Sequence, residues 1–178
     1  MTANTIMSTD LVVVNPNVTV AEALLVMSEH EIHNLPVVDG DGGFVGLFSL
    51  RRFTHELLPT AARIDAESFR MDIGFLTDQS DEYLDRLREL GTRPVSDLLE
   101  KKKKLRFCEP DTPIPKLLQL LSENPTSLPV VVVEGESKRV VGMVSNWDVL
   151  NKVAVGLLTD ASQSAGNDSS GSAKAGED

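Results

Sequence analysis

The sequence predicts an α/β (α+β) fold built from two copies of one βαββα unit. Three kinds of segment recur in the same order: a proline followed by a helical apolar pattern, then Leu-Pro-Val-Val, then a glycine-containing apolar run. They lie at 15–24, 35–38 and 44–49, and again at 109–118, 128–131 and 140–145. Self-similarity of this kind is the signature of a duplicated structural unit.

Short apolar runs predict the strands. The first strand of each copy is expected at Leu11–Val14 and at Leu105–Cys108. The next two apolar runs of each copy should form a hairpin, because turn residues separate them, Asp39–Gly43 in the first copy and Glu134–Lys138 in the second. The acidic turn residues do not predict calcium binding, because no further carboxylate completes an EF-hand-like loop. Val140–Val144 lacks polar alternation, so we expect it to be covered on both faces.

Capping residues predict where the helices begin. Thr19 and Glu22 have the spacing of a capping box. In the second copy Thr112 is the expected cap, with Pro113 as the first helical residue. The expected buried faces are Val20, Ala23, Leu24 and Met27 in the first copy and Leu117, Leu118, Leu120 and Leu121 in the second.

Four segments follow from this pattern. They are a first repeat (1–53), an inter-repeat insertion (54–94), a second repeat (95–158) and an acidic, Ser- and Gly-rich tail expected to be disordered (159–178). Within the insertion, Asp81–Leu90 predicts a helix that ends at Gly91. The insertion either packs on the side of the module or offers a surface for a partner or for dimerisation.

The motif Gly142-Met143-Val144-Ser145-x-x-Asp148 joins a buried strand to the start of a helix. Combined with Leu128–Val131 and with the duplication, it resembles the CBS (cystathionine-β-synthase) domain, over about 6–53 and 95–152. The resemblance implies a tandem pair, or Bateman module, whose repeats pack sheet to sheet with pseudo-twofold symmetry. It also implies an adenosyl ligand (AMP, ADP, ATP or S-adenosylmethionine) in a cleft between the repeats.

Ser145 and Asp148 admit two interpretations. Ser145 can cap the helix, and Asp148 in its first turn suits the helix dipole. The same geometry can hold a ligand, because a carboxylate accepts from two ribose hydroxyls and helix N–H groups bind phosphate. The resemblance favours a ribose contact for Asp148 and a ribose or phosphate contact for Ser145. It implies that apolar residues of the first strand and of the Leu-Pro-Val strand enclose the adenine. The residues that match the pocket wall here are Ser127, Leu128, Pro129 and Val130.

The first copy departs from this motif. It keeps Ser49 but has Arg52 in place of the aspartate, and arginine has only donors. We therefore expect one competent ribose site, in the second copy. The corresponding residues of a degenerate first-repeat cleft are Ser49, Arg52, Asn34, Leu35 and Pro36. That cleft is either empty or adapted to an anion reached by Arg51 or Arg52, unless the arginine is simply solvated. Lys101–Lys104 is a solvated turn or a source of a phosphate-binding lysine.

Composition excludes several function classes. A single cysteine, Cys108, allows no internal disulfide and suits a reducing cytoplasm. A net charge of −10 argues against binding to nucleic acid or anionic membranes, and no apolar run is long enough to span a bilayer. The first residues do not form a signal peptide. His30 and His33 lack further ligands for a metal, and no catalytic motif is found.

We therefore expect a cytoplasmic, non-catalytic module that senses an adenine nucleotide, and hence energy state, without a catalytic cofactor. It should form a homodimer and regulate an unidentified partner protein. The alternative is an interaction or dimerisation module that binds no nucleotide and acts through the insertion at 54–94, with Ser145 and Asp148 serving only as a helix cap.

Overall fold

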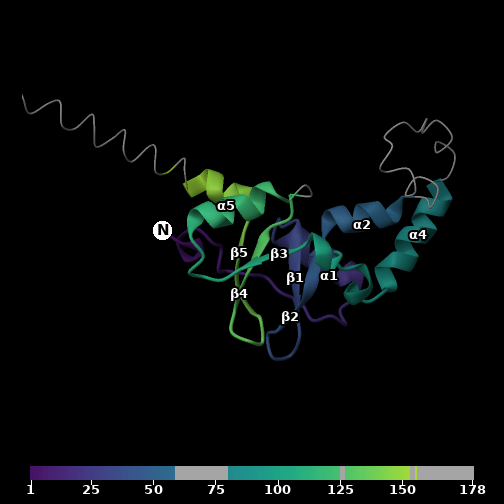
Figure 1. Cartoon of the computed structure of the whole chain (residues 1–178). Helices are drawn as coiled ribbons and strands as arrows, with labels where there is room; N and C mark the ends of the chain where they lie inside the picture. The colour runs from purple at the N-terminus through teal and green to yellow at the C-terminus, as the bar shows by residue number, and fades with distance from the viewer. Residues whose placement is uncertain (59–79, 125–126, 153–154, 156–178) are drawn as a thin grey trace, which may run out of the picture.

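The computed structural model describes residues 1–58, 80–124, 127–152 and 155, which form two similar α+β repeats (Figure 1). The first repeat contains α1 (Val20–Glu29), β1 (Asn34–Val38), β2 (Phe44–Ser49) and α2 (Leu50–Leu57). The second contains β3 (Arg106–Cys108), α5 (Ile114–Ser122), β4 (Val130–Glu134), β5 (Arg139–Val144) and a helix that begins at Asn146. Between the repeats, α4 (Ser80–Thr92) contacts α1 and α2. The predicted fold class is confirmed.

Both repeats use the same strand order. β3 and β4 are parallel, and β4 and β5 form an antiparallel hairpin. In the first repeat β1 and β2 form the corresponding hairpin. The predicted strand at Leu11–Val14 is reduced to one parallel bridge from Val14 to Val37, so that prediction was wrong in extent. Pro16 follows two residues later and has no N–H to extend the pairing.

Strand register corrects the alignment of the two Leu-Pro-Val-Val segments. Val37 pairs with Gly46, and Val132 pairs with Gly142, with a β-bulge directly after each pair. Val37 is therefore the counterpart of Val132, whereas the aligned motifs equate it with Val130. The offset arises because Gly46 and Gly142 take equivalent positions in the two hairpins. The number of residues between the Leu-Pro proline and this glycine differs between the two copies, so matching the prolines misaligns the strands.

Three helix predictions need correction. α5 begins at Ile114 with Pro113 as its N-cap, while the Thr112 hydroxyl accepts from the Glu109 N–H. Its Leu118 is 43% exposed because it lies off the face formed by Leu117 and Leu121. α4 continues through Gly91 to Thr92 and stops before Pro94, which disfavours helical backbone in the residue preceding it. The capping box at Thr19 is confirmed.

Short segments are exchanged between the repeats. Residues 3–7 open the first repeat in the chain but pack in the core of the second, where Ala3 is fully buried. η3 (Val95–Leu98) opens the second repeat in the chain but packs in the core of the first, where Val95 is fully buried. The Ser8 N–H donates to the Met143 carbonyl, and the Glu100 N–H donates to the Leu47 carbonyl in the equivalent place. This exchange ties the two repeats together and makes Ser8 the counterpart of Glu100.

The two hairpins meet in a small apolar cluster between the repeats. Leu47 from β2 packs there with Leu105 and Leu128, and Phe44 contacts Phe107 edge-on at a centroid distance of 5.5 Å. The hairpin turns lie side by side in Figure 1, where Gly43 forms a bridge with Arg139. The cluster fixes the relative position of the repeats.

Each exchanged segment crosses a strand glycine at close range. A Cβ added to Gly142 would lie 2.6 Å from the Met7 sulfur and 3.2 Å from the Ser8 carbonyl oxygen. We expect Gly142→Ala to destabilise the protein by about 1–3 kcal/mol, because backbone as well as side chain must shift. Urea unfolding measures this effect. Gly40→Ala is the control, since nothing lies within 4 Å of its added Cβ. Equal stability of the two variants would contradict the prediction.

Cys108 is buried in the second core, and burial raises the pKa of its thiol, as expected for a core cysteine. The tail predicted at 159–178 and residues 59–79 of the insertion lie outside the described residues. None of the described helices combines the length and apolar character that a membrane span requires.

Candidate functional site

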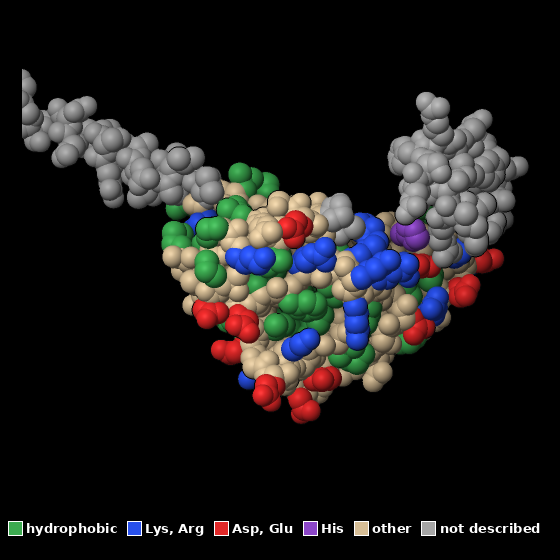
Figure 2. Space-filling view, in the orientation of Figure 1, with side chains coloured by type: hydrophobic (Ala, Val, Ile, Leu, Met, Phe, Trp, Pro, Cys, Tyr) green, Lys and Arg blue, Asp and Glu red, His purple; other side chains and the backbone are tan. Residues whose placement is uncertain are grey.

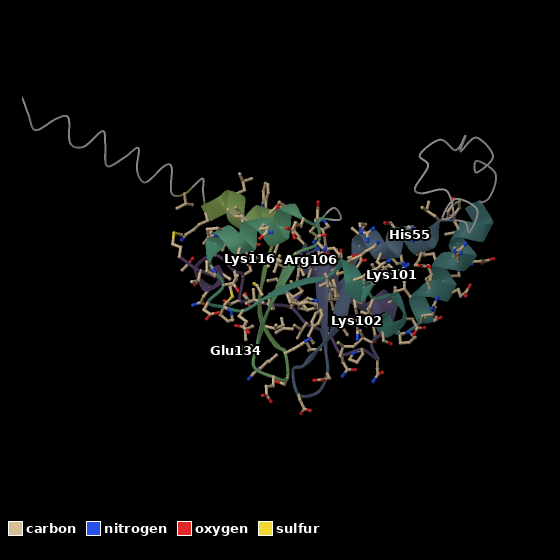
Figure 3. All side chains as sticks on the ribbon, viewed as in Figure 1. His55, Lys101, Lys102, Arg106, Lys116 and Glu134 are labelled. Carbon is tan, nitrogen blue, oxygen red and sulfur yellow. The ribbon has the colours of Figure 1, made fainter. Side chains whose placement is uncertain are left out.

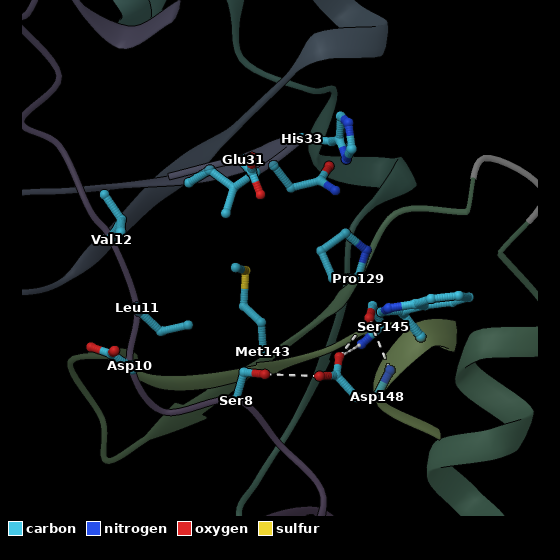
Figure 4. Close-up of a pocket in the computed structure, with 13 residues that line it drawn as sticks. Ser8, Asp10, Leu11, Val12, Glu31, His33, Pro129, Met143, Ser145 and Asp148 are labelled. Atoms are coloured by element: carbon cyan, nitrogen blue, oxygen red, sulfur yellow. Dashed lines mark hydrogen bonds between the residues drawn. The ribbon is translucent and has the colours of Figure 1, made fainter. Parts of the chain in front are cut away.

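A pocket of about 570 Å³ opens between the two repeats (Figure 4). The first half of the chain supplies Ser8, Asp10–Val12 and Glu31–Asn34 to the lining, and the second half supplies Pro129, Met143, Ser145, Trp147 and Asp148. The volume is in the range of ordinary small-molecule sites. We call it the Asp148 pocket.

The polar end of the pocket is built around the Asp148 carboxylate. Its Oδ2 accepts from the Ser145 backbone N–H at 2.7 Å and from the Ser145 hydroxyl at 2.5 Å. Its Oδ1 accepts from the Ser8 hydroxyl at 2.8 Å. The Ser145 hydroxyl in turn accepts from the Asp148 N–H at 3.3 Å, which completes a capping box at the start of the last helix. These contacts fix the carboxylate on a rigid element.

The remaining wall is largely apolar, with two further carboxylates. Leu11, Val12, Ile32, Pro129 and Met143 supply the apolar surface. Asp10 and Glu31 line the same pocket, together with Trp147, His33 and Asn34. The described lining therefore carries three carboxylates and no lysine or arginine.

The predicted second-repeat residues separate into two groups. Ser145, Asp148 and Pro129 line the pocket. Leu128 and Val130 are buried in apolar clusters, and Ser127 is exposed with a left-handed backbone (φ 53°). Leu128 and Val130 therefore support the wall from behind.

The first-repeat residues are arranged differently. The Ser49 hydroxyl donates to Glu100 at 2.5 Å, and Arg51 forms an ion pair with the same carboxylate at 2.9 Å. Arg52 instead pairs with Glu56 at 2.8 Å. Of the remaining predicted residues, Leu35 and Pro36 are buried in β1, and Asn34 lines the Asp148 pocket.

A basic surface lies near the contacts that Ser49 and Arg51 make with Glu100. Figure 2 shows lysine and arginine side chains gathered on one face, and Figure 3 labels Lys101, Lys102 and Arg106 in the same view of that face. Lys104 is closer to the protein interior, where burial and the nearby Arg51 cation lower the pKa of its ammonium group. Of the two earlier interpretations of Lys101–Lys104, the exposed side chains of the first three fit a solvated turn.

Comparison with protein families finds the CBS domain twice, at residues 3–59 and 95–155, which together cover more than half of the chain. The chain belongs to the CBS-domain family. Its two repeats form a tandem CBS pair. No curated protein sequence matches the chain significantly.

Solved structures with the same fold have low sequence identity to this chain, and CBS pairs are among them. CBSX2 from Arabidopsis thaliana, in complex with AMP, is 20% identical over 88% of this chain and 97% of that chain, with a TM-score of 0.62. The CBS pair of protein MJ0100, in complex with 5′-methylthioadenosine and S-adenosylmethionine, is 18% identical over 88% and 98%, with a TM-score of 0.59. Protein MJ1004 from Methanocaldococcus jannaschii is 14% identical with a TM-score of 0.62, and this CBS pair spans only 60% of its length.

Several pocket residues of the CBS pair were not assigned from the sequence. Ser8 and Asp10 lie before the predicted first strand and Leu11 at its start, and the place of Ser8 beside Asp148 depends on the segment exchange. Glu31 follows α1 with a left-handed backbone (φ 54°). Ile6-Met7 precedes the first strand of the first copy as Val95–Leu99 precedes that of the second. This correspondence was the available signal, but it does not reveal which repeat each segment packs against.

A metal site finds no support in the described part of the CBS pair. His30 and His33 are both exposed, and His33 lines the Asp148 pocket. No group of three or more His, Cys, Asp or Glu side chains converges among the described residues.

Proposed function

We propose that this CBS pair is a regulatory module that binds an adenosyl ligand in the Asp148 pocket. One observation carries the proposal: a rigid carboxylate stands at one end of a pocket of suitable size, and apolar side chains form its walls. CBS-pair proteins are generally regulatory rather than catalytic. We further propose that the module senses an adenine nucleotide or related compound and acts on a partner protein.

The polar end suits a ribose. A carboxylate offers about four acceptor positions, and the protein uses three of them here. The Ser8 side chain is exposed, so its hydroxyl can rotate away from Oδ1 and leave room for a vicinal diol. Ser145 keeps Asp148 oriented while the ribose hydroxyls replace the Ser8 hydroxyl at Oδ1.

The apolar walls suit an adenine ring. Val12 and Ile32 come from the first half of the chain, whereas Pro129 and Met143 come from the second. A flat ring between them would contact both repeats, so binding would couple to their relative position. A ligand shifts that position only if it binds one arrangement more tightly than another. The ligands of the two solved complexes, AMP for CBSX2 and methylthioadenosine with S-adenosylmethionine for MJ0100, support the adenosyl assignment.

We also propose that the protein forms a homodimer and acts in the cytoplasm. α5 and the last helix expose large apolar side chains, among them Leu118 (43%), Leu150 (51%) and Val155 (62%). Apolar exposure of this kind supports an interface. The single Cys108 fits a reducing compartment.

The second candidate is an interaction module that binds no nucleotide. It is favoured by the complete capping box, which accounts for Ser145 and Asp148 without any ligand. Its function would then rest with the insertion at 54–94.

Titration calorimetry and thermal unfolding separate the two candidates. Dialysed protein is tested with AMP, ATP, 5′-methylthioadenosine and S-adenosylmethionine. A ligand at about 100 Kd adds roughly 2.7 kcal/mol of stability, which should raise Tm by roughly 5–10 °C for a chain of this size. If none of the four compounds gives heat or a Tm shift, the adenosyl proposal fails and the second candidate remains.

Electrostatics predicts which adenosyl compounds bind best. Asp10, Glu31 and Asp148 repel a phosphate, so neutral methylthioadenosine or cationic S-adenosylmethionine should bind more tightly than AMP. The double variant Asp10→Asn/Glu31→Gln should improve AMP affinity by about 5–10-fold at low salt, roughly 1–1.4 kcal/mol. Its affinity for methylthioadenosine should stay unchanged and provides the internal control. Equal effects on both ligands would contradict the electrostatic explanation.

A further inference from the structure

We propose that the Glu100 carboxylate is an internal ligand that fills a phosphate-binding position in the first repeat. This position is the pseudo-symmetric counterpart of the polar end of the Asp148 pocket. Glu100 corresponds to Ser8, because their N–H groups donate to Leu47 and Met143, which follow the two equivalent glycines. The proposal goes beyond adenosyl binding and does not depend on it.

The Glu100 carboxylate has the contacts expected of a bound anion. Oε1 accepts from the Ser49 hydroxyl at 2.5 Å, and the Arg51 Nη2 lies 3.0 Å from Oε1 and 2.9 Å from Oε2. The Glu100 side chain is 1% exposed. Hydroxyl and guanidinium donors are also the groups that bind phosphate in proteins. Glu100 thus occupies a donor set that is equally suited to a phosphate oxygen.

Charge around this position favours an anion larger than one carboxylate. The Lys104 ammonium interacts electrostatically with Arg51, Arg52 and Glu100, and its lowered pKa reflects burial and the neighbouring cations. Arg52 pairs with Glu56, which leaves Glu100 with Arg51 as its ion-pair partner and with Lys104 as a second cation close enough to act on it electrostatically. A phosphate with about two negative charges would balance this pair better than one carboxylate does.

The two pseudo-symmetric positions therefore have opposite charge preferences. In the second repeat the helix supplies Asp148 and the exchanged segment supplies Ser8, a neutral donor. In the first repeat Arg52, the counterpart of Asp148, pairs with Glu56, and the neighbouring helix residue Arg51 pairs with Glu100, an anion from the exchanged segment. A ribose finds no acceptor there except Glu100 itself, and a phosphate must displace Glu100. The wild-type protein should bind phosphate compounds weakly at this position.

The test replaces Glu100 by the residue found at its counterpart. Glu100→Ser should bind inorganic pyrophosphate at least ten times more tightly than wild type, measured by calorimetry at constant ionic strength. Adding Arg51→Gln should abolish the gain, whereas adding Asp148→Asn should leave it intact. The proposal is overturned if wild type and Glu100→Ser bind pyrophosphate equally, or if the gain survives Arg51→Gln.

A second variant covers a failure of Glu100→Ser to fold. Glu100→Gln keeps the size of the side chain while leaving Arg51 and Lys104 uncompensated. If either variant is unfolded in chloride, pyrophosphate should restore its circular dichroism spectrum, because the anion would bind the native state alone. Failure of pyrophosphate to restore folding, with chloride at the same ionic strength as the control, would also overturn the proposal.

Discussion

Asp148→Asn is expected to weaken binding of the adenosyl ligand by at least about 100-fold. The carboxylate would accept from two ribose hydroxyls, whereas an amide offers one oxygen and a donor that opposes the second hydroxyl. Hydrogen bonds to a charged group contribute about 1.5–3 kcal/mol each, and 100-fold corresponds to about 2.7 kcal/mol. Calorimetry with methylthioadenosine measures the loss.

The control separates ligand binding from folding. Asp148→Asn also weakens the capping box, so a stability loss of about 0.5–2 kcal/mol is expected without ligand. Asp85→Asn makes the same charge change at a side chain that is 77% exposed and pairs only with Arg88 in the described structure. It should leave affinity unchanged. Ligand affinity retained in Asp148→Asn would refute the assigned role of Asp148.

Arg51→Gln is expected to destabilise the protein by about 3 kcal/mol. Removing one partner of a buried ion pair costs about 3–5 kcal/mol because a buried charge is left uncompensated. We take the lower end, since Arg51 is 41% exposed although its partner Glu100 is 1% exposed. Glu100→Gln should cost at most about 1 kcal/mol, because the half-exposed Arg51 can turn into water. Urea unfolding compares the two variants.

Arg93→Gln provides a matched control for Arg51→Gln. Arg93 is also 41% exposed, but its partner Asp97 is 43% exposed. Its removal should cost at most about 1 kcal/mol, as is usual for surface pairs. The arginines are equally exposed in the two pairs, and the largest difference is the burial of the acid, which is 1% exposed in Glu100 and 43% exposed in Asp97. A similar cost for both arginine variants would show that Glu100 is effectively solvated.

Local patterns in the sequence predicted most of the elements. The Thr19–Glu22 box and the Ser145–Asp148 spacing each gave a helix start, because capping depends on residues three apart. The hairpins followed from turn residues between apolar runs. Element ends were less certain: Gly91 does not end α4, because the helix remains favourable until the residue before Pro94.

The candidate site could be predicted only in part. Asp148 and Ser145 were found because one local motif contains both. Ser8 lies 140 residues from Asp148, and nothing in the local sequence places the two side chains together. Glu100 likewise gave no signal, since a lone glutamate before four lysines is usually solvated. Its burial results from the segment exchange.

The sequence by itself determined the duplication, the order of elements in each copy and the loss of an aspartate in the first copy. These features depend on residue type and on spacing within a few positions. Tertiary structure alone decided that 3–7 and 95–98 pack on opposite repeats, and that Val37 matches Val132. It also decided that Glu100 faces Ser49 and Arg51. Such contacts depend on how segments far apart in the sequence pack together. The short apolar segment at the start of either repeat could pack in the core of either one, so local sequence does not decide between them.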